Sequence, residues 1–326
     1  PPKSAPKDFM IYHKDVERIL EREKGLAEEL VLLLETVGKP DIDLIAVTAG
    51  PGLEPALWVG INFAKALAIA WSIPVMPINH MEGHVFSSLM QQRHSNILEN
   101  VGMSEVYEIP TIAYPALALL ISGGHTELIA IDKLLTYRLV GETRDDAIGE
   151  AFDKVARMMD LPYPGGPEVS KRAEAARARG VTPSITLPRP MIASDSCDFS
   201  FAGLKTAVLY TLRKYPALTE AMREEFALEF ENAVTEVIIK KTARAIEETG
   251  AHSLIVGGGV SANKNIRREL ANMRDERFPD LALFIPAPAL TTDNALMIAA
   301  AAYMRSALGY QPTSEFVASG TLAIEK

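Results

Sequence analysis

Short apolar runs that alternate with longer amphipathic segments constrain the fold of this chain more than any other feature. Residues 42–48 and 73–78 are rich in β-branched side chains, which favours buried strands. Helices are expected over 55–71, between these runs, and from His80, after the second run. Strands that alternate with helices in this way predict an α/β architecture.

A second block of strands and helices follows. Residues 116–122 and 125–131 predict a β-hairpin with Gly123 and Gly124 at its tip. Residues 91–110 are expected to form a mobile, irregular insertion, and 180–198 a loop. Further strands are expected at 136–140, 254–257 and 282–286, and further helices at 14–37, 146–160, 168–179, 202–214, 219–249, from Ser261 and from the cap 291–294 to Tyr303.

Length and composition limit the possible classes. A chain of 326 residues exceeds the usual size of one hydrophobic core, so two domains are expected. No apolar run is long enough to span a bilayer, and Pro1–Asp8 lacks the apolar core of a secretory signal. One cysteine, Cys197, suits a reducing compartment. We expect a cytoplasmic protein, with the mitochondrial matrix as the alternative, that has no contact with a membrane.

The net charge of −9 argues against a protein that coats nucleic acid through its global field. A local basic groove remains compatible with this charge. Candidates for a basic edge, against the alternative of ordinary solvated helix surface, are Lys205, Lys214, Lys264, Arg267 and Arg268.

Two histidines lie four residues apart directly after the run 73–78. On a helix, His80 and His84 point the same way, and imidazoles so placed can chelate one divalent metal. Asn79 is a suitable N-cap for this helix. The spacing alone is equally compatible with surface or core histidines, so a third ligand is needed. Asp293, at the start of a late helix, offers either an N-cap or that third ligand.

Two glycine clusters follow strands, at Ser122–Thr126 and Gly257–Gly259. Glycine lets backbone amides approach a phosphate closely. Neither cluster is followed by the Gly-Lys-Ser/Thr of a Walker A loop. Each by itself is compatible with a structural turn, whereas the pair resembles the phosphate and adenosine contacts of actin-like ATPases.

The segment Asp145–Lys154 carries a third set of polar residues. Glu150, Asp153 and Lys154 fall within one helical turn and can line the edge of a cleft. Asp153 can accept a hydrogen bond from a ribose. The alternative for Glu150 and Lys154 is an exposed ion pair.

In this order the motifs resemble the TsaD type of tRNA threonylcarbamoyltransferase. The resemblance covers residues 42–304, and its motifs are Gly50–Leu53, His80–His84, Ser122–Thr126, Gly149–Lys154, Tyr163–Pro167, Phe199–Lys205, Gly257–Asn263 and Thr291–Asn294. Eight ordered motifs are far more specific than any one of them.

The resemblance implies a two-lobed, actin-like (ribonuclease-H-like) ATPase fold. The N-terminal lobe would span 1–114 and be completed by 295–326, and the C-terminal lobe would span 115–294, with the adenylate site at the interface. The family pattern begins with a strand that carries an acidic residue near the phosphates. Nothing before residue 14 resembles this strand, so the N-terminal lobe is expected to lack its usual first strands.

The resemblance also implies transfer of threonylcarbamoyl from threonylcarbamoyl-AMP to an adenosine beside the anticodon of tRNA. The nucleotide ligand would be ATP or threonylcarbamoyl-AMP. His80, His84 and Asp293 would bind one divalent metal, with Fe²⁺ favoured over Zn²⁺. Asp153, Lys154 and Glu150 would form the catalytic set. The adenylate contacts would be Leu120, Ile121, Ser122, Gly123, Gly124, Asp153, Gly166, Asn263, Gly257 and Gly258. The implied partners are tRNA, a related actin-like subunit and a small ATPase, with a homodimer also possible.

Three other functions are compatible with parts of this pattern. A zinc peptidase needs His-Glu-x-x-His, whereas Glu82 is two residues after His80, which on a helix turns it away from a metal. An actin-like ATPase or sugar kinase would use the same cleft and leave the histidines idle. A non-catalytic scaffold paralogue would dimerise with an active partner.

Overall fold

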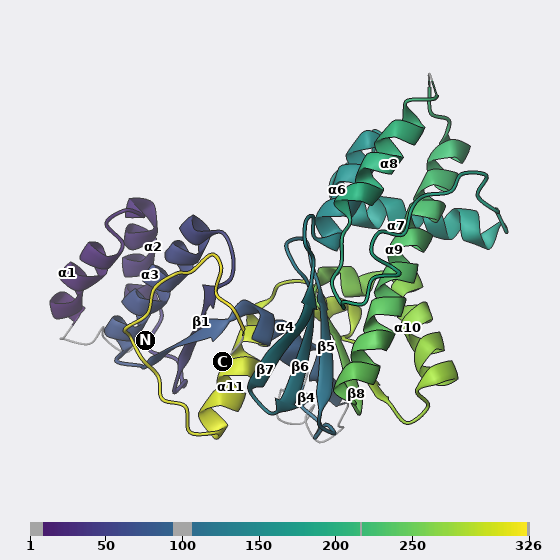
Figure 1. Ribbon diagram of the computed structural model, residues 1–326. Coiled ribbons are helices and arrows are strands. Elements are labelled where there is room, and N and C mark those ends of the chain that lie inside the picture. The colour runs from purple at the N-terminus through teal and green to yellow at the C-terminus, as the bar shows by residue number, and fades with distance from the viewer. Residues whose placement is uncertain (1–8, 94–105, 216, 325–326) are drawn as a thin grey trace. The chain divides into compact units, whose positions relative to one another are not determined.

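The computed structural model describes residues 9–93, 106–215 and 217–324 (Figure 1). The chain forms two compact units. The first contains the chain up to Gly83 together with Asn294–Ile324, and the second contains His84–Asp293. The predicted boundary lay at residue 114 instead. Residues after Gly83 belong to the second unit because Ser87 Oγ donates to the Leu290 carbonyl (2.6 Å) and Ser88 Oγ to the Val256 carbonyl (2.8 Å).

The first unit is built on a small parallel sheet. Among the described residues, β1 (Ile45–Gly50) pairs with β2 (Val75–Asn79) in parallel. The connection between them is α3 (Glu54–Trp71), as predicted. The unit also contains α1 (Phe9–Ile19), α2 (Lys24–Thr36), the first turn of α4 (His80–Leu89) and α11 (Ala295–Ala307).

The prediction of a single helix over 14–37 is wrong, because one helix ends at Ile19 and a second begins at Lys24. The apolar spacing is helical throughout, which is why the pattern suggested one helix. The break lets Leu20 and Leu30, from either side of it, pack in one buried cluster with Ala66 of α3. Gly25, a poor helix former, lies next to the break and lowers the cost of interrupting the helix.

The C-terminal segment ties itself to the same unit. The Ser319 amide donates to the Ala49 carbonyl (2.9 Å), and the Thr313 amide donates to the Val75 carbonyl (3.0 Å). Asn79 Nδ2 donates to the carbonyls of Leu322 (3.1 Å) and Ala323 (3.2 Å). The residue that precedes His80 is therefore held by the C-terminal segment.

The second unit contains a five-stranded mixed sheet in the order β7-β6-β5-β8-β9. The hairpin is antiparallel and continues into a third antiparallel strand, whereas β8 and β9 are parallel to β5. The strands are β5 (Ala116–Ile121), β6 (Thr126–Lys133), β7 (Thr136–Glu142), β8 (Ser253–Gly257) and β9 (Ala282–Phe284). All five confirm predicted strands within a few residues.

Helices cover this sheet and form the buried core with it. The 30-residue α9 packs against β5 and β6 (Figure 1). Phe230 of α9 meets Phe152 edge to face, with ring centroids 5.0 Å apart. The helical segments of the unit are α6 (Ile148–Met158), α7 (Gly165–Ala178), α8 (Ala202–Leu212), α9 (Glu220–Thr249), η1 (Gly259–Ala262), α10 (Lys264–Arg277) and η2 (Pro288–Leu290).

The predicted irregular insertion at 91–110 is partly ordered. Strands β3 (Gln91–Arg93) and β4 (Val106–Glu108) form an antiparallel pair that its polar sequence did not suggest. The residues between them lie outside the described part of the chain. The loop at 180–198 is confirmed. Within the described ranges, no helix combines the length and the apolar character that crossing a membrane requires.

Candidate active site

The two histidines lie on α4, whose start is fixed by a side-chain cap. Asn79 Oδ1 accepts hydrogen bonds from the backbone amides of Met81 (2.9 Å) and Glu82 (3.4 Å), which confirms the predicted N-cap. His80 is half-buried and His84 is buried. One turn of a single helix relates them, so their rings lie on the same face.

Asp293 supplies a carboxylate to this pair. His84 Nε2 lies 3.3 Å from Asp293 Oδ1, and the candidate ligand atoms of His80, His84 and Asp293 all lie within 4.8 Å of one another. Asp293 is not the helix cap, because Asn294 Oδ1 accepts from the Met297 amide (2.9 Å) instead. The Asp293 carboxylate is therefore available to the histidines. Two imidazoles and one carboxylate at these distances are a suitable donor set for one divalent cation.

Glu82 has a different role from the histidines beside it. Its side chain is fully buried and receives two hydrogen bonds from Arg305, from Nε (2.7 Å) and Nη2 (2.6 Å). This bidentate pair ties α4 to α11 within the first unit. A peptidase of the His-Glu-x-x-His type needs a carboxylate that is free to act as a base, and Glu82 is committed to Arg305.

A cleft of about 630 Å³ lies within the second unit. Its lining comes from the hairpin tip, α6, the start of α7, η1 and the start of α10. The lining includes Gly123, Gly149, Asp153, Gly166 and Asn263. Its size suits a nucleotide-sized ligand.

Gly149 lets the start of α6 pack closely against the hairpin tip. A Cβ on Gly149 would lie 2.7 Å from the Ser122 carbonyl oxygen and 2.8 Å from Gly123 Cα, so only glycine permits this contact. The Gly149 amide also donates to the Ser122 carbonyl (3.1 Å). By contrast, a Cβ on Gly123 or Gly124 would meet no atom within 4 Å. The tip is thus held from behind by α6 and faces open space in front.

Asp153 and Lys154 are adjacent on α6 but lie in different surroundings. Asp153 lines the cleft, and its Oδ1 accepts from the Gly165 amide (2.7 Å), which holds the turn before α7. Lys154 Nζ binds Asp146 (2.8 Å) and Glu150 (2.7 Å), so the predicted Glu150–Lys154 ion pair is present. Hydrogen bonding to Asp146 and then to Glu150 raises the pKa of Lys154. Lys154 is therefore held between two carboxylates.

Asp145 and Asp146 anchor the segment Phe199–Lys205. Asp145 Oδ1 accepts from the Phe201 (2.7 Å) and Ala202 (3.1 Å) amides at the start of α8. Asp146 also pairs with Lys205 (2.7 Å), which removes that lysine from the candidate basic edge. Arg267 likewise turns inward, with its Nη2 2.8 Å from the Pro286 carbonyl.

Comparison of the sequence with models of known protein families identifies the family of this chain. A family model described as tRNA N6-adenosine threonylcarbamoyltransferase, TsaD, matches residues 27–300. The chain belongs to this family. It is 42% identical over 286 residues to the tRNA N6-adenosine threonylcarbamoyltransferase of Staphylococcus carnosus, covering 87% of this chain and 76% of the relative. It is 44% identical over 269 residues to that of Chromobacterium violaceum, covering 81% and 72%.

Solved structures show a related fold at low sequence identity. Full-length HypF in its phosphate- and nucleotide-bound form superposes with a TM-score of 0.52 and 11% identity, over 88% of this chain and 42% of HypF. HypF from T. kodakarensis gives the same TM-score over 89% and 43%. Both comparisons agree with the mixed α/β fold described above.

The predicted adenylate contacts of this TsaD family member fall into four groups. Gly123, Asp153, Gly166 and Asn263 line the cleft, whereas Ser122 and Gly124 belong to the tip without lining it. Leu120 and Ile121 are fully buried in β5. Gly257 and Gly258 serve packing: a Cβ would lie 2.9 Å from the His84 carbonyl oxygen at Gly257 and 2.4 Å from the Ile121 carbonyl oxygen at Gly258, which has a positive φ.

The prediction missed a polar network among residues that line the cleft. Asn263 Nδ2 donates to Glu231 (2.7 Å) and to Ser170 Oγ (2.8 Å), while its Oδ1 accepts from the Ile266 amide (2.9 Å) and caps α10. Glu231 also binds Arg177 Nη2 (2.8 Å). Both amide hydrogens of Asn263 are thus engaged by protein partners. Two glutamates, 229 and 231, in an otherwise apolar stretch of α9 were the signal that could have revealed this network.

Proposed function

We propose that this chain transfers the threonylcarbamoyl group of threonylcarbamoyl-AMP to the exocyclic amine of the adenosine 3′ of the anticodon in tRNAs that read ANN codons. Besides membership of the TsaD family, one observation carries the proposal. Thr292 lines the nucleotide-sized cleft, and the next residue, Asp293, pairs with His84. A cation-binding donor set and a cleft for the adenylate thus share one short segment of the second unit.

His80, His84 and Asp293 would hold the metal, with Fe²⁺ preferred over Zn²⁺ because two histidines and a carboxylate are typical of non-haem iron sites. A bound divalent cation supplies Lewis-acid polarisation of a carbonyl or carboxylate oxygen of the donor. The chain's own task at this position is to hold the three donor atoms in place, and the Asn79 cap does so for the helix that carries both histidines.

The glycine tip is suited to binding the phosphate of the donor. Gly123 and Gly124 face open space, so their backbone can approach an anion that a side chain would keep away. Asp153 would accept a ribose hydroxyl, since its Oδ1 already fixes the turn at Gly165 and its other oxygen has lone pairs available. Gly166 and Asn263 would complete the walls, with Asn263 acting by positioning α10.

In the transfer step, the adenosine N6 atom attacks the carbamoyl carbon of the donor. The new C–N bond forms, the bond from that carbon to the phosphate oxygen breaks, AMP leaves, and N6 loses one proton. The N6 lone pair is delocalised into the purine, so positioning and activation of the acyl group must supply most of the rate. Of the predicted catalytic set, Asp153 faces the cleft, while Glu150 and Lys154 orient α6 through their ion pairs.

The wider setting of the reaction is proposed on the same family basis. The chain would have a two-lobed actin-like fold and act with a related actin-like subunit and a small ATPase. It would be located in the cytoplasm, where tRNA is modified. A homodimer is the alternative assembly.

The experiment is direct. The metal-loaded chain, with its partner proteins, is incubated with threonylcarbamoyl-AMP labelled in the threonine and with unmodified tRNA that reads ANN codons. Label in the adenosine next to the anticodon supports the proposal. Label that stays in the donor, or free threonine as the sole product, would overturn it.

A further inference from the structure

A cationic cavity lies in the second unit away from the cleft. It has a volume of about 330 Å³ and is bordered by α9, by the end of α10 and by residues 192–194 of the long loop. Its charged lining residues are Lys240, Lys241, Arg244, Arg277 and Glu247. Lys240 lies nine residues along α9 from Glu231 of the cleft, which is about 14 Å of helix. The cavity is therefore a separate site.

Lys241 is the most unusual member of this group. The residue is buried, and its ammonium donates to the Ser194 carbonyl (3.2 Å), Ser194 Oγ (2.8 Å) and the Ser196 carbonyl (2.6 Å). All three acceptors are uncharged, and no carboxylate of the described residues lies within ion-pairing distance of Lys241. Burial of a cation without a carboxylate is costly, and burial lowers the pKa of Lys241. An anion in the cavity would offset this cost.

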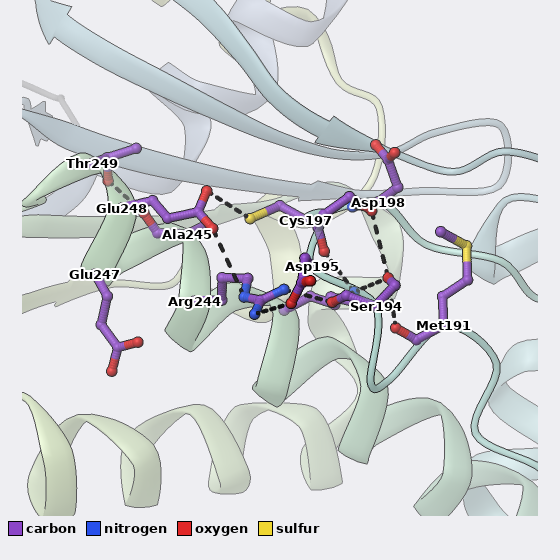
Figure 2. A network of polar contacts seen from close by, with 12 residues as sticks. Met191, Ser194, Asp195, Cys197, Asp198, Arg244, Ala245, Glu247, Glu248 and Thr249 are labelled. Atoms are coloured by element: carbon purple, nitrogen blue, oxygen red, sulfur yellow. Dashed lines mark hydrogen bonds and ion pairs between the residues drawn. The ribbon is translucent and has the colours of Figure 1, made fainter.

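Arg244 brings a second cation to the same loop. It donates to the Ser194 carbonyl (2.5 Å), so Lys241 and Arg244 share one acceptor. Figure 2 shows Arg244 between Ser194, Asp195 and Glu248. Its carboxylate contacts are weak, because Asp195 (3.2 Å) is fully exposed and Glu248 (3.7 Å) is half-exposed.

The remaining charges leave the cavity positive. Arg277 pairs with Glu247 (2.8 Å), the one carboxylate of the lining. Lys240 is exposed and takes part in none of the ion pairs found among the described residues. The lining thus carries four cations and one acid, while Asp195 and Glu248 meet Arg244 from outside the lining.

We propose that this cavity, formed by Lys240, Lys241, Arg244 and Arg277, binds a phosphate oxyanion. Guanidinium groups match the geometry of phosphate oxygens, and the lysines add point charges. The phosphate has two sources: a backbone phosphodiester of tRNA, which rests on the proposed function, or a free phosphate or phosphorylated small molecule, which does not.

Binding measurements on the full chain test the site without any activity assay. Inorganic phosphate is titrated into the wild type, Lys240→Glu and Lys133→Glu at constant ionic strength, and the amide spectrum is followed by NMR. Lys240 is chosen because its exposed side chain holds no partner, so the variant keeps its fold, and Lys133 is an exposed lysine of β6 that gives the same change in net charge. Binding of an unmodified tRNA transcript to the three proteins is measured in parallel.

The expected result is a saturable phosphate response in the wild type and in Lys133→Glu, weakened about tenfold or more in Lys240→Glu, which corresponds to the loss of one charged contact. If tRNA affinity falls in parallel and phosphate competes with tRNA, the source is the tRNA backbone. If tRNA affinity is the same in both variants, the source is a free phosphate compound. The proposal is overturned if Lys240→Glu weakens neither phosphate nor tRNA more than Lys133→Glu does.

Discussion

His84 Nε2 and Asp293 Oδ1 lie 3.3 Å apart, although the two residues stand at opposite ends of the sequence of the second unit. The residue that caps α11 is Asn294, and the neighbouring carboxylate of Asp293 lies beside the histidine instead. Two adjacent residues thus have two tasks that the sequence alone could not separate: Asn294 caps the helix and Asp293 pairs with His84.

Substitutions of these two neighbours should therefore affect different properties, metal affinity for Asp293 and stability for Asn294. Asp293→Asn should lower the affinity for Fe²⁺ by about 100-fold or more, because it removes a charged ligand. Asn294→Ala should lower the free energy of unfolding by about 1 kcal/mol through the lost cap, and leave the metal affinity within a few-fold of the wild type. Metal titrations and urea unfolding of both variants check this. Equal metal affinity in the two variants would contradict the assignment.

Glu82 should affect stability and not metal content. Glu82→Ala leaves the Arg305 guanidinium without its buried partner, at a cost of about 3–5 kcal/mol. Urea unfolding should show this loss, and metal analysis of the folded fraction should match the wild type. A peptidase centre would lose a catalytic base instead, so retention of stability together with altered metal-dependent chemistry would refute this account.

Substitution of the cleft glycines by alanine should have two kinds of effect, on stability at Gly149 and on AMP binding at Gly123. Gly149→Ala forces a Cβ against the backbone at Ser122 and Gly123, and should destabilise the chain by about 1–3 kcal/mol. Gly123→Ala meets no atom in the chain, so its stability should stay close to that of the wild type while binding of AMP weakens. Gly38→Ala, also without close contacts but outside the cleft, is the control for both measurements. Unchanged AMP binding by Gly123→Ala would exclude the tip as the phosphate site.

Asp146 should make stability depend on pH in the acid range. Burial alone would raise its pKa, but Lys154 and Lys205 hold the pKa of Asp146 below its ordinary value of 3.8. A carboxyl whose pKa is depressed by folding stabilises the protein fully above its unfolded pKa, and this contribution is lost as the pH falls through the folded pKa.

Asp146→Asn should therefore lower the free energy of unfolding at pH 7 by about 1 kcal/mol, a value reduced because both lysines reach solvent. The difference from the wild type should shrink below pH 4. Urea unfolding at pH 7 and pH 3 measures it, with Asp280→Asn, an exposed aspartate, as the control. A difference that stays constant between the two pH values would contradict the ion-pair explanation.

Local patterns predicted most of the elements, because strand runs and helix caps depend on neighbouring residues. The β5–β6 hairpin, α3 and the Asn79 cap are examples. The break between α1 and α2 was not predictable from periodicity, since packing on α3 decides it.

Within the candidate site, sequence spacing suggested residue types but not their partners. Lys154 looked like a catalytic group until Asp146, eight residues earlier, proved to bind it. Asn263 looked like a ligand contact, yet Glu231 and Ser170 occupy its amide. Such pairs follow from tertiary packing, which the residues of one motif do not reveal.

On our proposal, threonylcarbamoyl transfer requires a metal that His80, His84 and Asp293 bind. The most direct test compares the wild type, the double variant His80→Ala/His84→Ala and Asn294→Ala in a reconstituted reaction with threonylcarbamoyl-AMP, tRNA and partner proteins. Modified adenosine is quantified by mass spectrometry of the digested tRNA. We predict product with the wild type and Asn294→Ala, and none with the folded double variant. Normal tRNA modification by the double variant would contradict the account.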